Sequence, residues 1–175
     1  MRKVLCITML AAALCVSTLS ATSVMYVPLE RSVDMSDVVL VGHVLHTEAG
    51  YNAAGEIVTR VDLLVEESLK GFVPEGEVFS FHAWGGSVGG VKMETVGEAR
   101  YQLGQKVLVQ LENIDGEFHT LGLSFGKWDV VKDQKGMQWV ARSLSDLNVV
   151  GLNESPVERM PLRSMRDIVR GRHAF

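Results

Sequence analysis

The chain has 175 residues, of which 47% are hydrophobic and 22% are charged, and its formal net charge at pH 7 is −4. This length suits one domain that buries a sizeable core, and the slightly acidic balance argues against a general nucleic-acid binder. The sequence contains no repeat period, low-complexity stretch or interdomain linker, so we expect residues 23–175 to form a single domain.

The first 22 residues have the layout of a secretory signal peptide. Arg2 and Lys3 come first, an apolar run extends from Val4 to Val16, and small residues follow it. Because this run is shorter than the ~20 residues that span a bilayer, we expect a cleaved signal peptide at 1–22 and no transmembrane segment in the mature chain. Cleavage removes two positive charges and changes the formal net charge from −4 to −6. We therefore expect an exported protein, periplasmic or extracellular.

Both cysteines, Cys6 and Cys15, lie inside the predicted signal peptide. The mature chain therefore has no cysteine, although an exported chain reaches a compartment where disulfides form. Its stability must come from a packed core.

The mature chain begins with a predicted helical turn within residues 28–37, where Leu29 and Val33 have helical spacing. The first predicted strand follows at 38–46 and is apolar on both faces, as in a strand that is covered on two sides. Strict alternation along this strand places His43 on one face and His46 on the other.

The clearest alternation in the chain occupies residues 57–71. Apolar and β-branched residues fall on one side of a strand here, while Arg60, Asp62 and Glu66 fall on the other. Helical spacing of the apolar residues competes, but the β-branched cluster and the turn at Lys70-Gly71 favour a strand. With the loop at 49–55, the first two strands make a long hairpin.

Further strands are expected after the turn at 74–76, separated by glycine-containing turns. They are predicted at 77–84, 91–96, 106–111, 118–123, 127–131 and 137–141. Seven or eight short strands predict a β-barrel or a β-sandwich. The strongest period-two runs predict one shared core made of Val39, Val41, Val61, Leu63, Val65, Phe79, Phe81, Val107 and Val109.

The chain ends in a predicted helix. Ser155, Pro156 and Glu158 have the order of a helix start, but Pro161 interrupts it, so we expect the helix at 162–170, stopped by a glycine. Four arginines recur at spacings of four, three and four: Arg159, Arg163, Arg166 and Arg170. They either pair with acidic residues of the barrel or present a cationic stripe to an anionic partner. We keep the last three as candidate binding residues.

Residues 85–89 match the G-x-S-x-G pattern of serine hydrolases, with Ser87 as the nucleophile and His82 nearby. That motif works as an elbow between a strand and a helix, whereas the residues after Gly90 have the pattern of a strand. A glycine loop between two strands is the better interpretation, and Ser87 and His82 stay weak catalytic candidates. The run also lacks the lysine of a phosphate-binding loop, so we assign no catalytic residue and expect no cofactor.

The histidines do not predict a metal site. The spacing of His43 and His46 sends them to opposite faces of a strand, and a bulge between them would be needed to bring both to one ion. The other histidines, at positions 82, 119 and 173, are scattered along the chain. Of the tryptophans, Trp84 is kept as a candidate binding residue, although tryptophans in a small barrel more often cover the core.

Four segments carry a resemblance to known proteins: S-D-V-V-L-V-G-H-V, V-D-L-L-V-E-E-S-L-K-G, G-Q-K-V-L-V-Q-L and G-L-S-F-G-K-W-D-V. Together with the Gly-Gly loop they resemble a family of uncharacterised secreted bacterial proteins. The first half also resembles the netrin-like module of the tissue inhibitors of metalloproteinases. The resemblance covers roughly residues 36–131 and implies a mainly β fold, a closed or partly open OB-like β-barrel of about seven strands with a C-terminal helix.

The inhibitor mechanism does not transfer with this resemblance, because it depends on a cysteine at the mature N-terminus and this chain has none there. The resemblance implies exposed faces and loops that bind another macromolecule. We therefore expect an exported, non-enzymatic binding or interaction module whose partner is an envelope or extracellular protein. A small serine hydrolase using Ser87 and a protease inhibitor acting through a loop are the alternatives.

Overall fold

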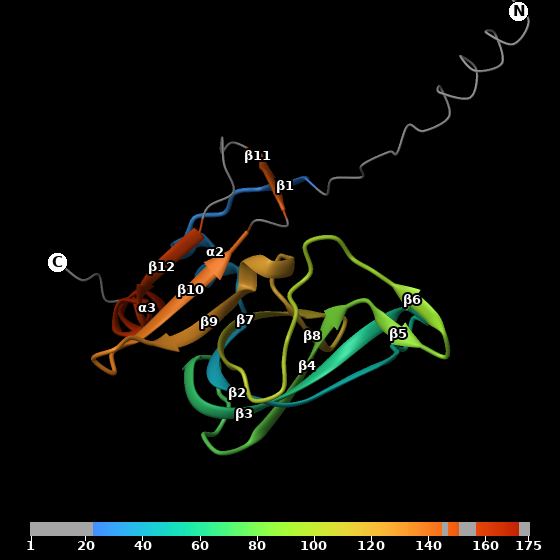
Figure 1. Ribbon diagram of the computed structural model, residues 1–175, viewed down its shortest axis with the longest axis horizontal. Coiled ribbons are helices and arrows are strands. Elements are labelled where there is room, and N and C mark those ends of the chain that lie inside the picture. The colour runs from blue at the N-terminus through green and yellow to red at the C-terminus, as the bar shows by residue number, and fades with distance from the viewer. Residues whose placement is uncertain (1–22, 145–146, 151–156, 172–175) are drawn as a thin grey trace, which may run out of the picture.

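The computed structural model describes residues 23–144, 147–150 and 157–171 (Figure 1). The predicted signal peptide, the predicted helix start at Ser155 and Pro156, and His173 lie outside these residues. Among the described residues, no helix is both long and apolar enough to cross a membrane.

The fold is mainly β, as the sequence predicts. In chain order the elements are β1 (Ser23–Met25), α2 (Leu29–Met35), β2 (Val38–Tyr51), β3 (Ile57–Lys70), β4 (Val78–Trp84), β5 (Gly86–Val88), β6 (Val91–Met93), β7 (Lys106–Ile114), β8 (Glu117–Thr120), the 3-10 helix η2 (Leu123–Gly126), β9 (Lys127–Lys132), β10 (Gln138–Ser143), β11 (Asn148–Val150), β12 (Val157–Pro161) and α3 (Leu162–Val169).

Most strands belong to one mixed sheet in the order β12-β10-β9-β7-β2-β3-β4-β8. Strand β7 also pairs with β8, so β7, β2, β3, β4 and β8 close into a ring. The ring is uneven, because β4 and β8 meet in parallel through a single residue pair, His82 with His119. The predicted barrel of about seven strands differs from this arrangement, since β9, β10 and β12 extend the sheet away from the ring.

The long hairpin of β2 and β3 lies in the interior of the sheet, and it is bent. Its register shifts at three places, between Val39 and Leu40, between Val41 and Gly42, and between Val44 and His46. Such bulges bend and twist a strand pair. At Gly42 the strands approach so closely that a Cβ atom would lie 2.2 Å from the carbonyl oxygen of Leu64, which explains the glycine there.

The core has two main clusters on opposite faces of this sheet. The prediction of one shared core is therefore wrong for Val39 and Val41, which pack with Trp128 and with Leu162 and Met165 of α3. The remaining predicted residues gather on the other face, inside the ring: Val61, Leu63, Val65, Phe81, Val107 and Val109, with Phe79 partly buried against them. Strand β2 is covered on both sides, so alternate residues enter different clusters.

The C-terminal helix α3 lies over the outer face of the sheet with α2, whereas the β5–β6 hairpin lies at the other end of the molecule (Figure 1). The helix ends one residue before the predicted boundary. Residues 157–161 before it form β12, which pairs antiparallel with β10. Glu158 is therefore a strand residue rather than an acid of the first helical turn.

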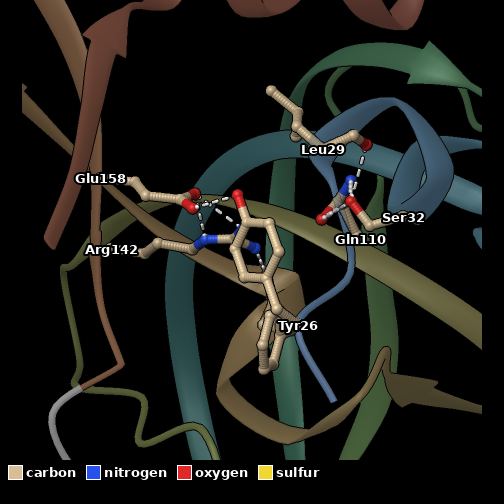
Figure 2. Close-up of polar contacts among 7 residues, drawn as sticks. Tyr26, Leu29, Ser32, Gln110, Arg142 and Glu158 are labelled. Atoms are coloured by element: carbon tan, nitrogen blue, oxygen red, sulfur yellow. Dashed lines mark hydrogen bonds and ion pairs between the residues drawn. The ribbon is translucent and has the colours of Figure 1, made fainter. Parts of the chain in front are cut away.

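A buried ion pair fastens β12 to β10. The Arg142 side chain is 1% exposed, and its Nε donates to Oε2 of Glu158 at 2.9 Å. The guanidinium also lies over the ring of Trp128 at 4.2 Å. Tyr26 donates its hydroxyl to the other oxygen of Glu158 at 3.0 Å, so the segment after β1 joins the same group (Figure 2).

A second polar contact holds α2 against the sheet. Gln110 of β7 is fully buried, and its Nε2 donates to the Ser32 hydroxyl at 3.1 Å. Ser32 in turn donates to the carbonyl oxygen of Leu29 at 2.8 Å (Figure 2). These contacts satisfy a buried amide that the apolar core would otherwise leave unpaired.

Candidate functional site

A cleft of about 330 Å³ opens where β4 ends and the β5–β6 hairpin begins. We call it the Trp84–Glu98 cleft. It is lined by Thr59, Ala83, Trp84, Gly85, Gly86, Lys92, Met93, Glu94, Thr95, Glu98, Ala99, Arg100 and Tyr101. Its volume lies within the range of small-ligand pockets.

Two glycines, Gly85 and Gly86, line the cleft. Gly86 has a φ of 147°, and a Cβ atom there would lie 2.7 Å from Cβ of Ala49 and 2.9 Å from Oγ1 of Thr59. The carbonyl oxygen of Gly85 accepts a hydrogen bond from the Thr59 hydroxyl at 2.7 Å. The Gly-Gly pair therefore lets the chain leave β4 closely against β3, which places the hairpin beside the cleft.

Glu98 is the unusual residue of this cleft. Both of its carboxyl oxygens are buried and have no hydrogen-bond partner among the described residues. Burial raises the pKa of Glu98 from 4.5 to about 7, and the nearby backbone amides of Ala99 and Trp84 offset only part of that effect. Among the described residues no cation pairs with Glu98, and Arg100 and Lys92 at the rim contact Glu94 instead. The cleft therefore holds a buried carboxyl group whose nearest donors are the backbone amides of Ala99 and Trp84, and these compensate only partly for its burial.

Ser87 lies in β5, where it is exposed and pairs with Lys92 of β6. A second strand follows it, so the elbow between a strand and a helix is absent at this motif. Within the described part of the chain no hydrogen bond joins Ser87 to a histidine. His82, the other weak catalytic candidate, contacts Glu117 instead.

The C-terminal arginines mostly face their own sheet. Arg166 and Arg170 both pair with Glu67 of β3, at 2.8 Å and 3.1 Å. These contacts match the intramolecular alternative for the stripe and tie α3 to β3. Arg163 is exposed and borders a depression of about 380 Å³ that Lys132 also lines. Arg159 lies over the ring of Trp139 at 4.6 Å.

The expectation that His43 and His46 face opposite ways is wrong. The register shift between Val44 and His46 leaves His43 opposite Leu64 and His46 opposite Asp62, and those two β3 residues point to the same face. Each histidine nevertheless contacts its own carboxylate: His43 meets Glu66 at 2.8 Å, and His46 meets Glu48 at 3.8 Å.

The structure instead brings together two histidines that are 37 positions apart in the sequence. His82 of β4 and His119 of β8 form the single residue pair between these strands, and Glu117 lies beside both. Trp84 stacks on His119 with ring centroids 4.3 Å apart and ring planes 15° apart. Trp84 therefore contributes to two neighbouring features, the Trp84–Glu98 cleft and this histidine cluster.

Glu98 and Glu117 are not among the site residues that the sequence predicts. Neither belongs to a motif, and each gains its environment from segments that are distant in the chain. The sequence feature that could have indicated this region is the position of Trp84 and His82 on one predicted strand beside a glycine pair.

No protein-family model, curated protein or solved structure matches this chain.

Proposed function

We propose that the protein is an exported, non-enzymatic binding module, that its partner is an envelope or extracellular protein, and that the Trp84–Glu98 cleft is the binding element. The observation that carries this proposal is the buried Glu98 carboxyl, which has no cationic partner among the described residues, in a cleft of ligand size. Burying a carboxyl group that is only partly compensated costs free energy, and a ligand that supplies a cationic donor recovers part of that cost. The site thus favours a partner that inserts a lysine side chain or another amine.

The aromatic wall adds apolar contact to this charge complementarity. Trp84 offers a large flat surface, and its neighbour Tyr101 is held by a hydrogen bond of 2.8 Å to Thr120. Aromatic side chains that are fixed in place are common anchors of binding sites. The stem of an inserted lysine can pack on Trp84 while its amine reaches Glu98.

We infer further that the ring of β7, β2, β3, β4 and β8 is an OB-like barrel. The order of the ring supports it, since β2, β3 and β4 form a meander, β8 pairs with β4, and β7 closes back onto β2. This is the connectivity of a five-stranded Greek-key barrel, a scaffold that commonly binds ligands through its loops and one face. The netrin-like resemblance implies the same fold, and the signal-peptide pattern supports export.

The test is capture of partners from the envelope fraction by the immobilised exported protein. We expect a discrete partner that is retained by wild type, lost with Trp84→Ala and weakened at least tenfold with Glu98→Gln. Trp139→Ala is the matched control, because Trp139 lies on β10 outside the cleft, and it should retain the partner. Equal capture by wild type and Glu98→Gln would contradict the assignment of the cleft.

A further inference from the structure

The cluster of His82, Glu117 and His119 has the composition and spacing of a metal site. One ligand atom from each residue lies within 4.8 Å of the other two. Oε2 of Glu117 is 3.5 Å from Nδ1 of His82 and 3.7 Å from Nε2 of His119. The two imidazole rings have their centroids 5.6 Å apart.

These distances are too long for hydrogen bonds, which join such atoms at about 2.7–3.2 Å. They are close to the separation of two ligands on one tetrahedral ion. With bonds of about 2.0–2.1 Å, neighbouring ligand atoms around zinc lie roughly 3.4 Å apart. The separation of the two imidazole nitrogens is within 4.8 Å, so binding of one ion requires side-chain rotations that bring all three atoms to bonding distance.

The histidines also lack the partners that a purely structural role would supply. Nδ1 of His82 and Nδ1 of His119 are buried and have no hydrogen-bond partner among the described residues. His119 is only 2% exposed. Buried polar atoms are normally hydrogen-bonded. Nδ1 of His82 is the nitrogen that faces Glu117, so this unsatisfied atom is a second, independent sign of a missing ligand, while His119 faces the same carboxylate through Nε2.

The local structure holds these residues in place before any ion arrives. Glu117 and His119 are two apart on β8 and therefore point to the same face, and the pairing of β4 with β8 sets His82 beside them. Trp84 stacks on His119 and fixes the plane of its ring.

We propose that His82, Glu117 and His119 bind a divalent transition-metal ion, with Zn²⁺ as the best match to two imidazoles and one carboxylate. The set leaves a fourth coordination position open. Beside it lies a cavity of about 160 Å³ lined by Glu117, His119 and Trp84, together with Glu56 and Asp115. Water completes the coordination there.

This metal site is separate from the Trp84–Glu98 cleft, and the metal proposal can be tested independently of the proposed partner. Glu98 is not one of its ligands, and Glu117 does not line the cleft. Glu98→Gln should therefore leave metal binding unchanged, while Glu117→Gln should leave capture of the partner unchanged.

The experiment is calorimetric titration of the exported protein, freed of metal with a chelator, with Zn²⁺ alone at pH 7.5. We expect one ion per chain and binding at least 30-fold weaker for Glu117→Gln and for His82→Gln. These variants are chosen because both side chains keep some exposure, whereas replacing the buried His119 risks unfolding. The matched control is the double variant His46→Gln, Glu48→Gln, an exposed pair that should bind zinc as wild type does.

Co²⁺ supplies a second readout that reports the ligands directly. Because Trp84 stacks on a proposed ligand, Co²⁺ should quench tryptophan fluorescence in wild type and much less in Trp84→Phe. The Co²⁺ complex should also show the visible absorption bands typical of cobalt with a low coordination number. Failure of wild type to bind Zn²⁺ at 100-fold molar excess would overturn the proposal. Equal affinity of wild type and Glu117→Gln would do the same, as would loss of binding in the His46, Glu48 control.

Discussion

Replacing Glu158 with glutamine should destabilise the fold strongly, because it leaves a buried guanidinium without its counter-charge. Arg142 is 1% exposed, and Glu158 is 20% exposed and contacts it through Nε at 2.9 Å and through a second guanidinium nitrogen at 2.7 Å. Glutamine keeps the shape and can still accept from Tyr26, so the change mainly removes charge (Figure 2).

The expected loss of stability follows from the burial of Arg142 and Glu158. Breaking a buried ion pair by removing one partner costs about 3–5 kcal/mol, and the residual exposure of Glu158 places this case near 3 kcal/mol. For a chain of this size that is a fall in Tm of roughly 6–12 °C. Urea unfolding followed by circular dichroism, with the midpoint and slope fitted together, measures it.

The double variant Arg142→Met, Glu158→Leu separates the loss of charge pairing from the loss of packing. Apolar residues of similar volume need no counter-charge, so the double variant should be more stable than Glu158→Gln alone. Arg100→Gln is the control, since its contact with Glu94 is exposed and its removal should not move the midpoint measurably. Glu158→Gln unfolding at the wild-type urea concentration would refute the reasoning.

Four further outcomes are expected. Val61→Asp puts a charge into the fully buried core of the ring and should prevent folding or lower stability by more than about 3 kcal/mol; a circular dichroism melt like that of wild type would disprove the face assignment. The raised pKa of Glu98 means that the folded state holds the proton of this carboxyl more tightly than the unfolded state does. Wild type should therefore lose up to about 3 kcal/mol of stability relative to Glu98→Gln as the pH rises from 4.5 to about 7. Parallel curves of stability against pH for the two proteins would contradict this. Arg166→Gln breaks a half-buried contact with Glu67 and should cost up to about 1 kcal/mol, whereas Arg163→Gln should cost nothing measurable; reversal of that order in urea titrations would show that the stripe is oriented otherwise. A fluorophosphonate serine probe should not label the protein, and labelling that disappears in Ser87→Ala would establish the hydrolase alternative.

The sequence by itself determined the elements that depend on local pattern. Alternation of apolar and polar residues along Ile57–Lys70 depends only on the pleat of one strand, and it identified β3. The stop at Gly171 and the interruption at Pro161 act on neighbouring backbone, and they located α3 to within one residue. The glycine pair at the end of β4 marked the turn beside the cleft for the same reason.

Tertiary structure decided which faces meet and which side chains gather into sites. Alternation assigns two faces to β2 but does not say what covers each, so Val39 and Val41 were predicted in the wrong cluster. The bulge before His46 is a property of two paired strands, and no single-strand pattern contains it. Glu98 became a buried acid, and His82 met His119, only because ring closure joins segments that are far apart in the chain, and such pairings depend on the combined packing of all the strands.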